Sequence, residues 1–329
     1  MAERENKKAG SGFGLALSRR YYEEFGIPML ESFPGIRDFL AVGLAGSGSE
    51  CFGYDDEVSR DHDFEPGFAL FLPSEKSGLV SRRDAFLLER AYDALPREFE
   101  GLSRSRMNPV GGRRRGPLRT EEFFASKCGS PDGRLTARDW LTLPEHALAE
   151  AVNGEIFADP FGEVTEIRRR LAFYPEDIRL KKLAGALLLM KQAGIYNYPR
   201  ILSHGEEAGA QLAVFGFVRA AMGAVFLLNW RYRPYYKWQF RAMRDLGRLG
   251  DLADSLEFLM TTGNGPEDAK TKNAVIADAS ALILSAVRED GLAGGWAGDD
   301  PEEAAYAVNA EIRDAEIRNL HVLAGAEGE

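Results

Sequence analysis

The chain has 329 residues, which is too long for one small domain and fits two domains of ordinary size. Hydrophobic residues make up 45% and charged residues 28% of the sequence, the balance of a globular protein with a large buried core. The formal net charge of −10 argues against a general nucleic-acid binder, because such proteins usually carry a basic excess.

The sequence also bears on where the protein resides. The two cysteines, Cys51 and Cys128, give neither a disulfide framework nor a zinc-binding spacing, so we expect a reducing compartment. Residues 1–11 are polar and charged and lack the apolar segment of a secretory signal. The most apolar stretch, residues 212–230, is interrupted by Arg219 and Asn229, which favours a buried core helix over a membrane span. We predict a cytoplasmic protein with no membrane partner.

The first part of the chain combines helices and strands. Residues 1–10 read as a disordered tail, and the four-residue spacing of Leu17, Tyr21 and Phe25 predicts a helix over residues 15–33. Residues 36–45 are short, apolar and bounded by glycine, as in a buried strand. Residues 46–60 are rich in glycine and serine and then acidic, which indicates a loop with about one helical turn.

A second strand is predicted over residues 62–72. Four apolar residues of this segment share one parity, and Gly67 after Pro66 indicates a bulge or bend. A helix capped by Ser81 should follow over residues 81–99. A short strand is expected near residues 117–120, and the next helix should open at Thr120. The four apolar residues are Phe64, Phe68, Leu70 and Leu72.

From about residue 165 onward, helical periods dominate the sequence. The prolines near the predicted helix starts, such as Pro175 and Pro266, suit the first helical turn. The fold class is therefore α+β: a small mixed β-sheet domain over residues 11–165, then an all-α helical bundle over residues 166–329. Helices are predicted at residues 175–193, 208–232, 234–249, 252–262, 266–288 and 301–323.

The residues with the clearest chemistry are Asp61 and Asp63. Residues two apart on a strand point to the same face, so these carboxylates converge on one volume. Magnesium prefers oxygen ligands, usually one or two carboxylates together with substrate phosphates. His62 must face the opposite side, where a packed histidine is the simpler interpretation than a catalyst.

The loop before that strand supplies a matching part. Glycines allow the backbone to approach a phosphate closely, and the N–H groups and the Ser49 hydroxyl can bind its oxygens. We expect Ser49 at the N-cap of a short helical turn, and Gly53 to turn the chain back toward Asp61 and Asp63. An ordinary turn followed by a solvated strand end is the alternative for each part taken alone.

This arrangement resembles the signature of the polymerase-beta-type nucleotidyltransferase superfamily. The residues that carry the resemblance are Gly48-Ser49, Gly53, Ser59, Asp61 and Asp63. Within the superfamily, the layout is similar to the kanamycin and lincosamide nucleotidyltransferases, which place a helical domain after a small catalytic domain. The whole chain is also similar to an uncharacterised bacterial family whose helical region contains a Tyr-Pro-Tyr-x-Lys-Trp-like stretch, here residues 232–238.

The resemblance implies that Gly48, Ser49, Gly53 and Ser59 bind the nucleotide and that Asp61 and Asp63 hold Mg²⁺ or Mn²⁺. It also implies a third carboxylate on a later strand. Here the sequence departs from the pattern, because the expected strand offers arginines. Glu121 and Glu122 lie just beyond that strand, and Asp139 is a more distant candidate.

Two further basic features have open interpretations. The arginines at positions 104, 106, 113, 114 and 115 form a basic patch, which is either a solvated loop or a clamp for phosphate or acceptor. Lys237 follows a turn of proline and aromatic residues. By analogy with lysines in the helical domains of related enzymes, it is expected at the triphosphate, and a surface lysine beside Trp238 is the equal alternative.

The predicted function is Mg²⁺-dependent transfer of a nucleoside monophosphate from a nucleoside triphosphate, ATP by preference, to an acceptor hydroxyl. The catalytic residues would be Asp61 and Asp63. The acceptor is open between a small molecule, a protein and an RNA, and a homodimer is the candidate assembly. One alternative is a non-catalytic nucleotide-binding or regulatory module, such as an antitoxin. Another is a glycosyltransferase that uses Asp61 and Asp63 on a nucleotide-sugar.

Overall fold

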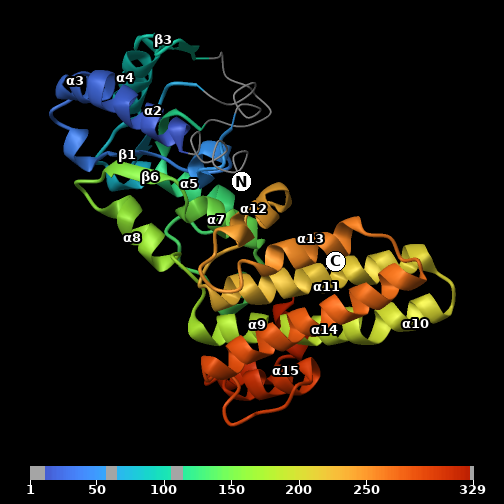
Figure 1. The fold of residues 1–329 in the computed structure, drawn as a ribbon. Coiled ribbons are helices and arrows are strands. Elements are labelled where there is room, and N and C mark those ends of the chain that lie inside the picture. Colours follow the sequence, from blue (N-terminus) through green and yellow to red (C-terminus); the bar gives the residue numbers. More distant parts are fainter. Residues whose placement is uncertain (1–11, 57–64, 105–113, 327–329) are drawn as a thin grey trace. The chain divides into compact units, whose positions relative to one another are not determined.

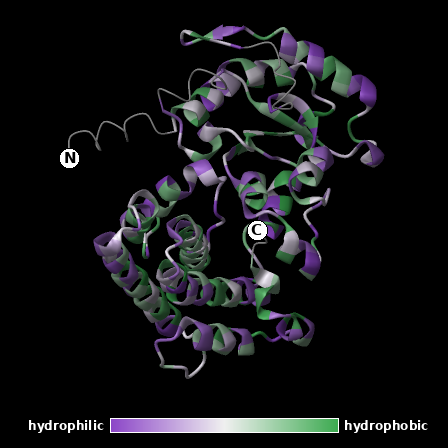
Figure 2. Cartoon of the chain, turned by 90° about the vertical axis from the view of Figure 1, so that its right-hand side faces the viewer, coloured by the Kyte–Doolittle hydropathy of each residue, from purple (hydrophilic) through white to green (hydrophobic). Residues whose placement is uncertain are grey.

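The computed structural model describes residues 12–56, 65–104 and 114–326 (Figure 1). Contacts divide the chain into two compact units, which are described separately. The first unit comprises residues 1–134 and 147–172, and the second comprises residues 135–146 and 173–329. Hydrophilic and hydrophobic residues alternate along the helices of both units, as expected for amphipathic helices that pack around a core (Figure 2).

The first unit is built on a four-stranded mixed sheet with the order β5-β2-β1-β6. β1 is antiparallel to both β2 and β6, whereas β2 is parallel to β5. The strands are β1 (Ala41–Leu44), β2 (Ala69–Leu72), β5 (Gly116–Arg119) and β6 (Glu155–Ala158), with a separate hairpin of β3 (Glu98–Phe99) and β4 (Leu102–Ser103). The helices are α2 (Phe13–Tyr21), α3 (Ile27–Glu31), α4 (Arg82–Asp93), α5 (Thr120–Cys128), α7 (Glu145–Val152) and α8 (Glu163–Arg170), and α7 begins in the second unit.

The core of the first unit lies between one face of this sheet and helices α2, α3 and α4. Phe68, Leu70 and Leu72 point into this core together with Tyr21 and Leu88, which confirms the parity expected for these three residues. Phe64 lies outside the described residues, and the strand predicted from residue 62 begins only at Ala69. On the other face of the sheet, the ring of Phe71 packs edge-on against that of Phe123 on α5, with the ring centroids 5.3 Å apart. Because both faces are covered, β1 and β2 are apolar at every position.

The second unit is a bundle around the two long helices α9 (Glu176–Met190) and α11 (Glu207–Leu228), which pack against each other. α9 is also covered by α15 and the short helix η8 (Val322–Gly325). The ammonium of Lys181 on α9 is buried and donates hydrogen bonds to Asn309 Oδ1 and to the carbonyls of Arg318 and Leu320. The remaining helices are α6 (Ala137–Thr142), η6 (Lys191–Asn197), α10 (Tyr198–Ser203), η7 (Tyr236–Trp238), α12 (Gln239–Arg244), α13 (Leu252–Thr261), α14 (Pro266–Glu289), α15 (Pro301–Ala310) and α16 (Ala315–Asn319).

α11 is long and apolar enough to cross a membrane by length and composition alone. Most of its apolar stretch is buried, and Phe217, Val218 and Phe226 on it are almost fully enclosed. A core helix satisfies the same criteria of length and composition as a membrane span. The expectation of a buried core helix over residues 212–230 is therefore confirmed.

The small mixed sheet followed by a helical region confirms the predicted α+β fold class. The predicted boundary at residue 165 falls inside α8, which groups with the first unit through residue 172. Several element limits were wrong. The helix predicted to reach residue 99 ends at Asp93, shortly before Pro96, and Glu98–Phe99 forms strand β3. The first strand starts only at Ala41, because residues Arg37–Phe39 form the short helix η2.

Candidate functional site

The sheet topology brings four chain segments to one edge. The carboxyl end of β1 lies beside the amino ends of β2 and β6, because β1 is antiparallel to both, and the parallel strand β5 begins beside β2. We call this the loop edge. It comprises residues 46–53 after β1, residues 65–67 before β2, residues 114–115 before β5 and residues 153–154 before β6.

The segment after β1 is fixed by hydrogen bonds to the amino end of β6. The Gly46 N–H donates to Asn153 Oδ1 at 2.9 Å, and Asn153 Nδ2 donates to the Gly46 carbonyl at 2.7 Å. The Gly154 N–H donates to the Cys51 carbonyl at 2.8 Å. Arg168 on α8 in turn donates to the Asn153 carbonyl at 2.8 Å. The loop is therefore held at both of its ends by the adjoining strand segment.

The predicted phosphate-binding loop forms one tight turn. The short helix η3 (Ser49–Phe52) has Gly48 at its N-cap, so the expectation of Ser49 at the N-cap is wrong by one residue. Ser49 is the first residue of the turn and is half-buried, and Gly53 ends the turn with a φ of 68°. A Cβ at position 48 would lie 2.3 Å from Glu50 Oε2, so a larger residue there would displace that carboxylate.

Glu50 is the central charged residue of the loop edge. It is 1% exposed, and its Oε1 lies 3.2 Å from Arg115 Nη2 and 3.7 Å from Arg114 Nη1. Arg115 Nη1 also lies 3.7 Å from Glu65 Oε1. Within the described residues, Glu50 Oε2 is buried without a hydrogen-bond donor. Two carboxylates and two guanidinium groups thus meet where strands β2 and β5 begin.

Gly67 explains how Arg115 reaches this position. Its φ is 147°, and a Cβ there would lie 2.8 Å from Arg115 Cδ and 2.7 Å from Tyr92 Oη. The Tyr92 hydroxyl accepts a hydrogen bond from the Phe68 N–H at 3.1 Å, and burial raises the pKa of Tyr92 to about 12. The bend expected at Gly67 therefore makes room for a tyrosine hydroxyl and an arginine side chain.

Two acidic residues of the loop segment have roles that the sequence analysis did not identify. Glu50 follows Gly48-Ser49 directly and is the counter-ion of Arg114 and Arg115. The sequence feature that could have predicted this pair is an acidic residue in a glycine-rich loop together with a run of arginines. Asp55 is 2% exposed and accepts hydrogen bonds from the N–H groups of Gly12 and Gly14, so it caps the start of α2. Cys51 is buried, and burial raises the pKa of its thiol, which suits a structural residue.

The arginine run serves two different purposes. Arg114 and Arg115 lie at the loop edge, whereas Arg119 donates hydrogen bonds to the carbonyls of Pro73 and Val80 at the far end of the sheet. Arg104 donates to the Tyr92 carbonyl at 3.1 Å and lies over the Tyr92 ring. The described members of the predicted basic patch are thus divided, because Arg104 contacts Tyr92 while Arg114 and Arg115 lie at the loop edge. The other two members, Arg106 and Arg113, lie outside the described residues.

The other predicted site residues fall into three groups. Ser59, Asp61 and Asp63, together with His62, lie outside the described residues. Glu121 and Glu122 begin α5 at the end of β5 away from the loop edge, so the structure does not bring them to Gly48 and Ser49. The distant candidate Asp139 caps α6 with Thr136. Lys237 lies in the second unit, with its ammonium 5.0 Å from the Trp238 ring.

Comparisons with known proteins add one match. A family model described as a domain of unknown function (DUF4037) matches residues 140–239, which contain the stretch 232–238. No curated protein and no solved structure matches the chain.

Proposed function

We propose that this chain is a Mg²⁺-dependent nucleotidyltransferase that moves a nucleoside monophosphate from a nucleoside triphosphate to an acceptor hydroxyl. The observation that carries the proposal is the loop edge, where a glycine-serine turn and two arginines meet at the start of the strand that follows Asp61 and Asp63. ATP is the expected donor. We place the reaction in the cytoplasm, and we expect a homodimer as the assembly.

The glycine-serine turn has the groups that a phosphate requires. The N–H groups of Gly48 and Ser49 have no hydrogen-bond acceptor among the described residues. The half-buried Ser49 adds a hydroxyl beside them. Consecutive backbone N–H groups that converge on one point form an anion-binding concavity. Because Asn153 and Gly154 fix the turn from both sides, these donors are held in place before the phosphate arrives.

Arg114 is the cation of the loop edge that is best placed to reach a phosphate. Its side chain is 18% exposed, against 9% for Arg115, and its contact with Glu50 is the longer of the two. A guanidinium group can hold two phosphate oxygens at once. Arg115, which lies between Glu50 and Glu65, would position Arg114 and the loop by neutralising both carboxylates.

The proposed ligands of the Mg²⁺ ion are the carboxylates of Asp61 and Asp63. Among the described residues, no group of three or more His, Cys, Asp and Glu side chains is arranged to hold a metal. Glu50 has one buried oxygen without a donor within this part of the chain, but its other oxygen faces two arginines. Two carboxylates fit Mg²⁺, which when bound would neutralise phosphate charge and activate the acceptor hydroxyl.

A non-catalytic nucleotide-binding or regulatory module is the second candidate, and a specific observation favours it. The strand expected to carry a third carboxylate, β5, is preceded by Arg114 and Arg115, and Glu121 and Glu122 follow its opposite end. A chain with two carboxylates and an arginine in place of the third would bind a nucleotide more readily than it would transform one. A nucleotide-sugar glycosyltransferase is less favoured, because the described sheet has only four strands of mixed direction.

The deciding experiment measures nucleotide binding and pyrophosphate release separately. Asp61→Ala combined with Asp63→Ala should abolish Mg²⁺-dependent ATP binding in calorimetry and the release of pyrophosphate. Asp93→Ala, at an exposed position at the end of α4, is the matched control and should retain both. If the native chain binds ATP without releasing pyrophosphate, the non-catalytic module is correct. If the double variant releases pyrophosphate at the native rate, the proposal is wrong.

A further inference from the structure

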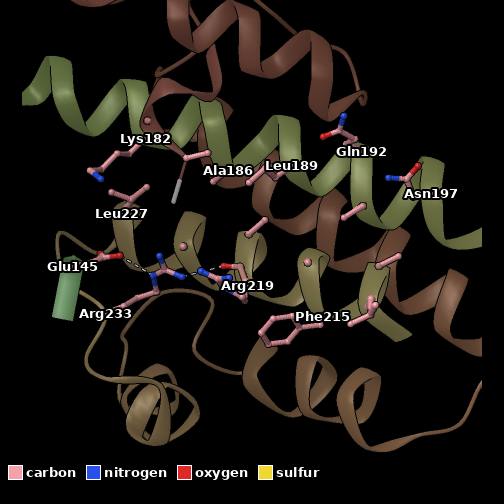
Figure 3. A pocket seen from close by; sticks show the side chains of 18 of the residues that line it. Glu145, Lys182, Ala186, Leu189, Gln192, Asn197, Phe215, Arg219, Leu227 and Arg233 are labelled. Carbon is pink, nitrogen blue, oxygen red and sulfur yellow. Dashed lines mark hydrogen bonds and ion pairs between the residues drawn. The ribbon is translucent and has the colours of Figure 1, made fainter. Parts of the chain in front are cut away.

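The second unit contains a cavity of about 800 Å³ that the nucleotidyltransferase proposal does not use. It lies between α9, with its continuation η6, and α11 (Figure 3). This volume falls within the range of about 300–1,000 Å³ that is typical of small-molecule sites. Small residues on the two helices create the space: Ala186, Ala193, Gly209, Ala213, Gly216, Ala220 and Gly223.

One end of the cavity is strongly charged, as Figure 3 shows for Glu145, Lys182 and Arg233. Glu145 Oε2 accepts a hydrogen bond from Arg233 Nε at 2.7 Å, and Arg233 Nη1 donates to the Arg219 carbonyl at 3.2 Å. Lys182 Nζ donates to the Leu141 carbonyl at 3.3 Å and lies 5.0 Å from the Tyr174 ring. Three cations therefore line the cavity against one carboxylate, Glu145.

Three of the four charged side chains at this end are almost fully enclosed, and Arg219 is half-buried. Glu145 and Arg233 are each 6% exposed, and Lys182 is 7% exposed. The second carboxylate oxygen of Glu145, Oε1, is buried and has no hydrogen-bond donor among the residues described. Buried like charges repel each other and are costly unless an opposite charge accompanies them. Cations exceed carboxylates among the residues that line this end, and Glu145 Oε1 can accept a hydrogen bond, so this end suits a ligand that carries a negative charge and a donor.

The other end of the cavity is apolar with two amide groups. Figure 3 shows Gln192, Asn197 and Phe215 at this end, away from Glu145 and Lys182. Leu212 is 72% exposed and Phe215 is 45% exposed, although both line the cavity. Large apolar side chains left open at the edge of a cavity favour the apolar part of a ligand.

We propose that this cavity binds a small organic anion with an apolar body. The acidic group would lie against Lys182 and Arg219, with a donor of the ligand on Glu145, and the apolar body would extend toward Phe215. The site belongs to the second unit alone and does not rest on the nucleotidyltransferase proposal. All of its lining residues except Gly325 and Ala326 lie within residues 140–239, the segment matched by the family model.

The test compares two fluorescent probes that share one apolar body. 1-Anilinonaphthalene-8-sulfonate carries a negative charge beside its N–H group, and N-phenyl-1-naphthylamine lacks the charge. In titrations of the full chain, the sulfonate should bind about tenfold more tightly than the uncharged probe, because charge-assisted contacts are the strong ones. Equal affinities for the two probes would overturn the proposal.

Charge variants assign the binding to this cavity. Arg219→Gln should weaken the sulfonate about tenfold and leave the uncharged probe unaffected. Arg231→Gln, at an exposed position beyond α11, is the matched control and should change neither affinity. Glu145→Gln should strengthen sulfonate binding, because it removes the one negative charge of the site. An Arg219→Gln variant that binds the sulfonate as the Arg231→Gln variant does contradicts the assignment.

A further control distinguishes anion binding in this cavity from the proposed nucleotidyltransferase activity. The variant with Asp61→Ala and Asp63→Ala should bind both probes with native affinity, whatever happens to its nucleotide binding. Circular dichroism of each variant checks that the helices are formed. If Glu145→Gln does not fold, the comparison of the Arg219 and Arg231 variants still decides the outcome.

Discussion

Glu50 is the single residue on which the charge balance of the loop edge depends. It is buried against Arg115, which is itself buried, so its removal would leave a guanidinium group without its closest counter-charge. Glu65 is more distant from Arg115, at 3.7 Å, and would compensate only in part. Removal of one partner of a buried ion pair lowers the free energy of unfolding by far more than the intact pair contributes, because the remaining charge stays buried without a counter-charge.

Replacement of Glu50 should therefore show this cost directly. Glu50→Gln is expected to lower the free energy of unfolding by about 3 kcal/mol in urea denaturation. Glu75→Gln removes the same charge from an exposed pair with Arg82, whose side chains are 46% and 84% exposed, and should cost under about 1 kcal/mol. Equal losses for the two variants would mean that the Glu50–Arg115 pair is not buried in solution.

The sequence predicted some features of the loop edge and missed others for a physical reason. A turn at Gly48, Ser49 and Gly53 could be predicted because glycine and serine form a local pattern, and nucleotide binding by these residues stays a prediction. Glu50 and Asp55 were missed because their partners are distant in sequence: Arg115 for one, and the N–H groups of Gly12 and Gly14 for the other. Pairing of this kind depends on the topology of the sheet, which local spacing does not encode.

At the scale of elements, the start of α8 combines acidic residues with opposite environments. Glu163 is half-buried, and burial raises the pKa of its carboxyl above the ordinary 4.5, with the carboxylates of Asp159 and Glu121 adding to the rise. Glu166, on the same helix, is exposed, and its hydrogen bond from Arg169 lowers its pKa. These opposite directions predict opposite dependences of stability on pH.

Below pH 4.5, Glu163 is mainly protonated in both the folded and unfolded chain, so it has little effect. As the pH rises through its raised folded pKa, the folded chain must hold a half-buried charge and loses stability. Glu163→Gln should therefore be more stable than the native protein at pH 7, with the gain vanishing in acid. Glu166→Gln should lose stability at pH 7 and match the native protein in acid. Urea denaturation at several pH values measures both.

The helices predicted over residues 175–193, 252–262 and 266–288 are observed with similar limits, whereas the single helix predicted over residues 301–323 was wrong, because this segment forms α15, α16 and η8. The helix predicted over residues 266–288 is observed as α14, Pro266–Glu289, with its proline in the first turn. In contrast, β6 was not predicted. Its residues, Glu155–Ala158, are mostly half-buried at the end of the sheet, so they lack the apolar run of a central strand. The helix α10 continues from η6 without a break that the sequence could signal.

At the scale of the whole molecule, the two units are interleaved in sequence. Residues 135–146 belong to the second unit although residues 147–172 return to the first. This short segment supplies Trp140, whose ring lies 5.8 Å from that of Tyr174, and Glu145, the counter-ion of Arg233. Prediction of a single boundary near residue 165 could not anticipate such an exchange, because the contacts that define it span long separations in sequence.

Two fragments would test how much the second unit depends on that segment. A fragment of residues 135–329 retains Glu145, whereas a fragment of residues 173–329 loses this carboxylate, which lies 2.7 Å from the buried Arg233 guanidinium. The shorter fragment should unfold at a lower urea concentration, with a loss of about 3 kcal/mol in the free energy of unfolding. Circular dichroism measures both transitions. Identical midpoints would show that residues 135–146 contribute nothing to the second unit.

The enclosure of α9 has a consequence for how the chain folds as it is synthesised. The Lys181 ammonium donates hydrogen bonds to Asn309, Arg318 and Leu320, which lie 128 to 139 residues later in the chain and are therefore synthesised well after it. Until then, one side of α9 lacks its cover of α15 and η8. The first unit, in contrast, has all of its residues once the chain has been synthesised up to residue 172. The second unit should therefore complete its core only once residues 309–325 have been synthesised, and a chain that lacks them would expose α9 to aggregation.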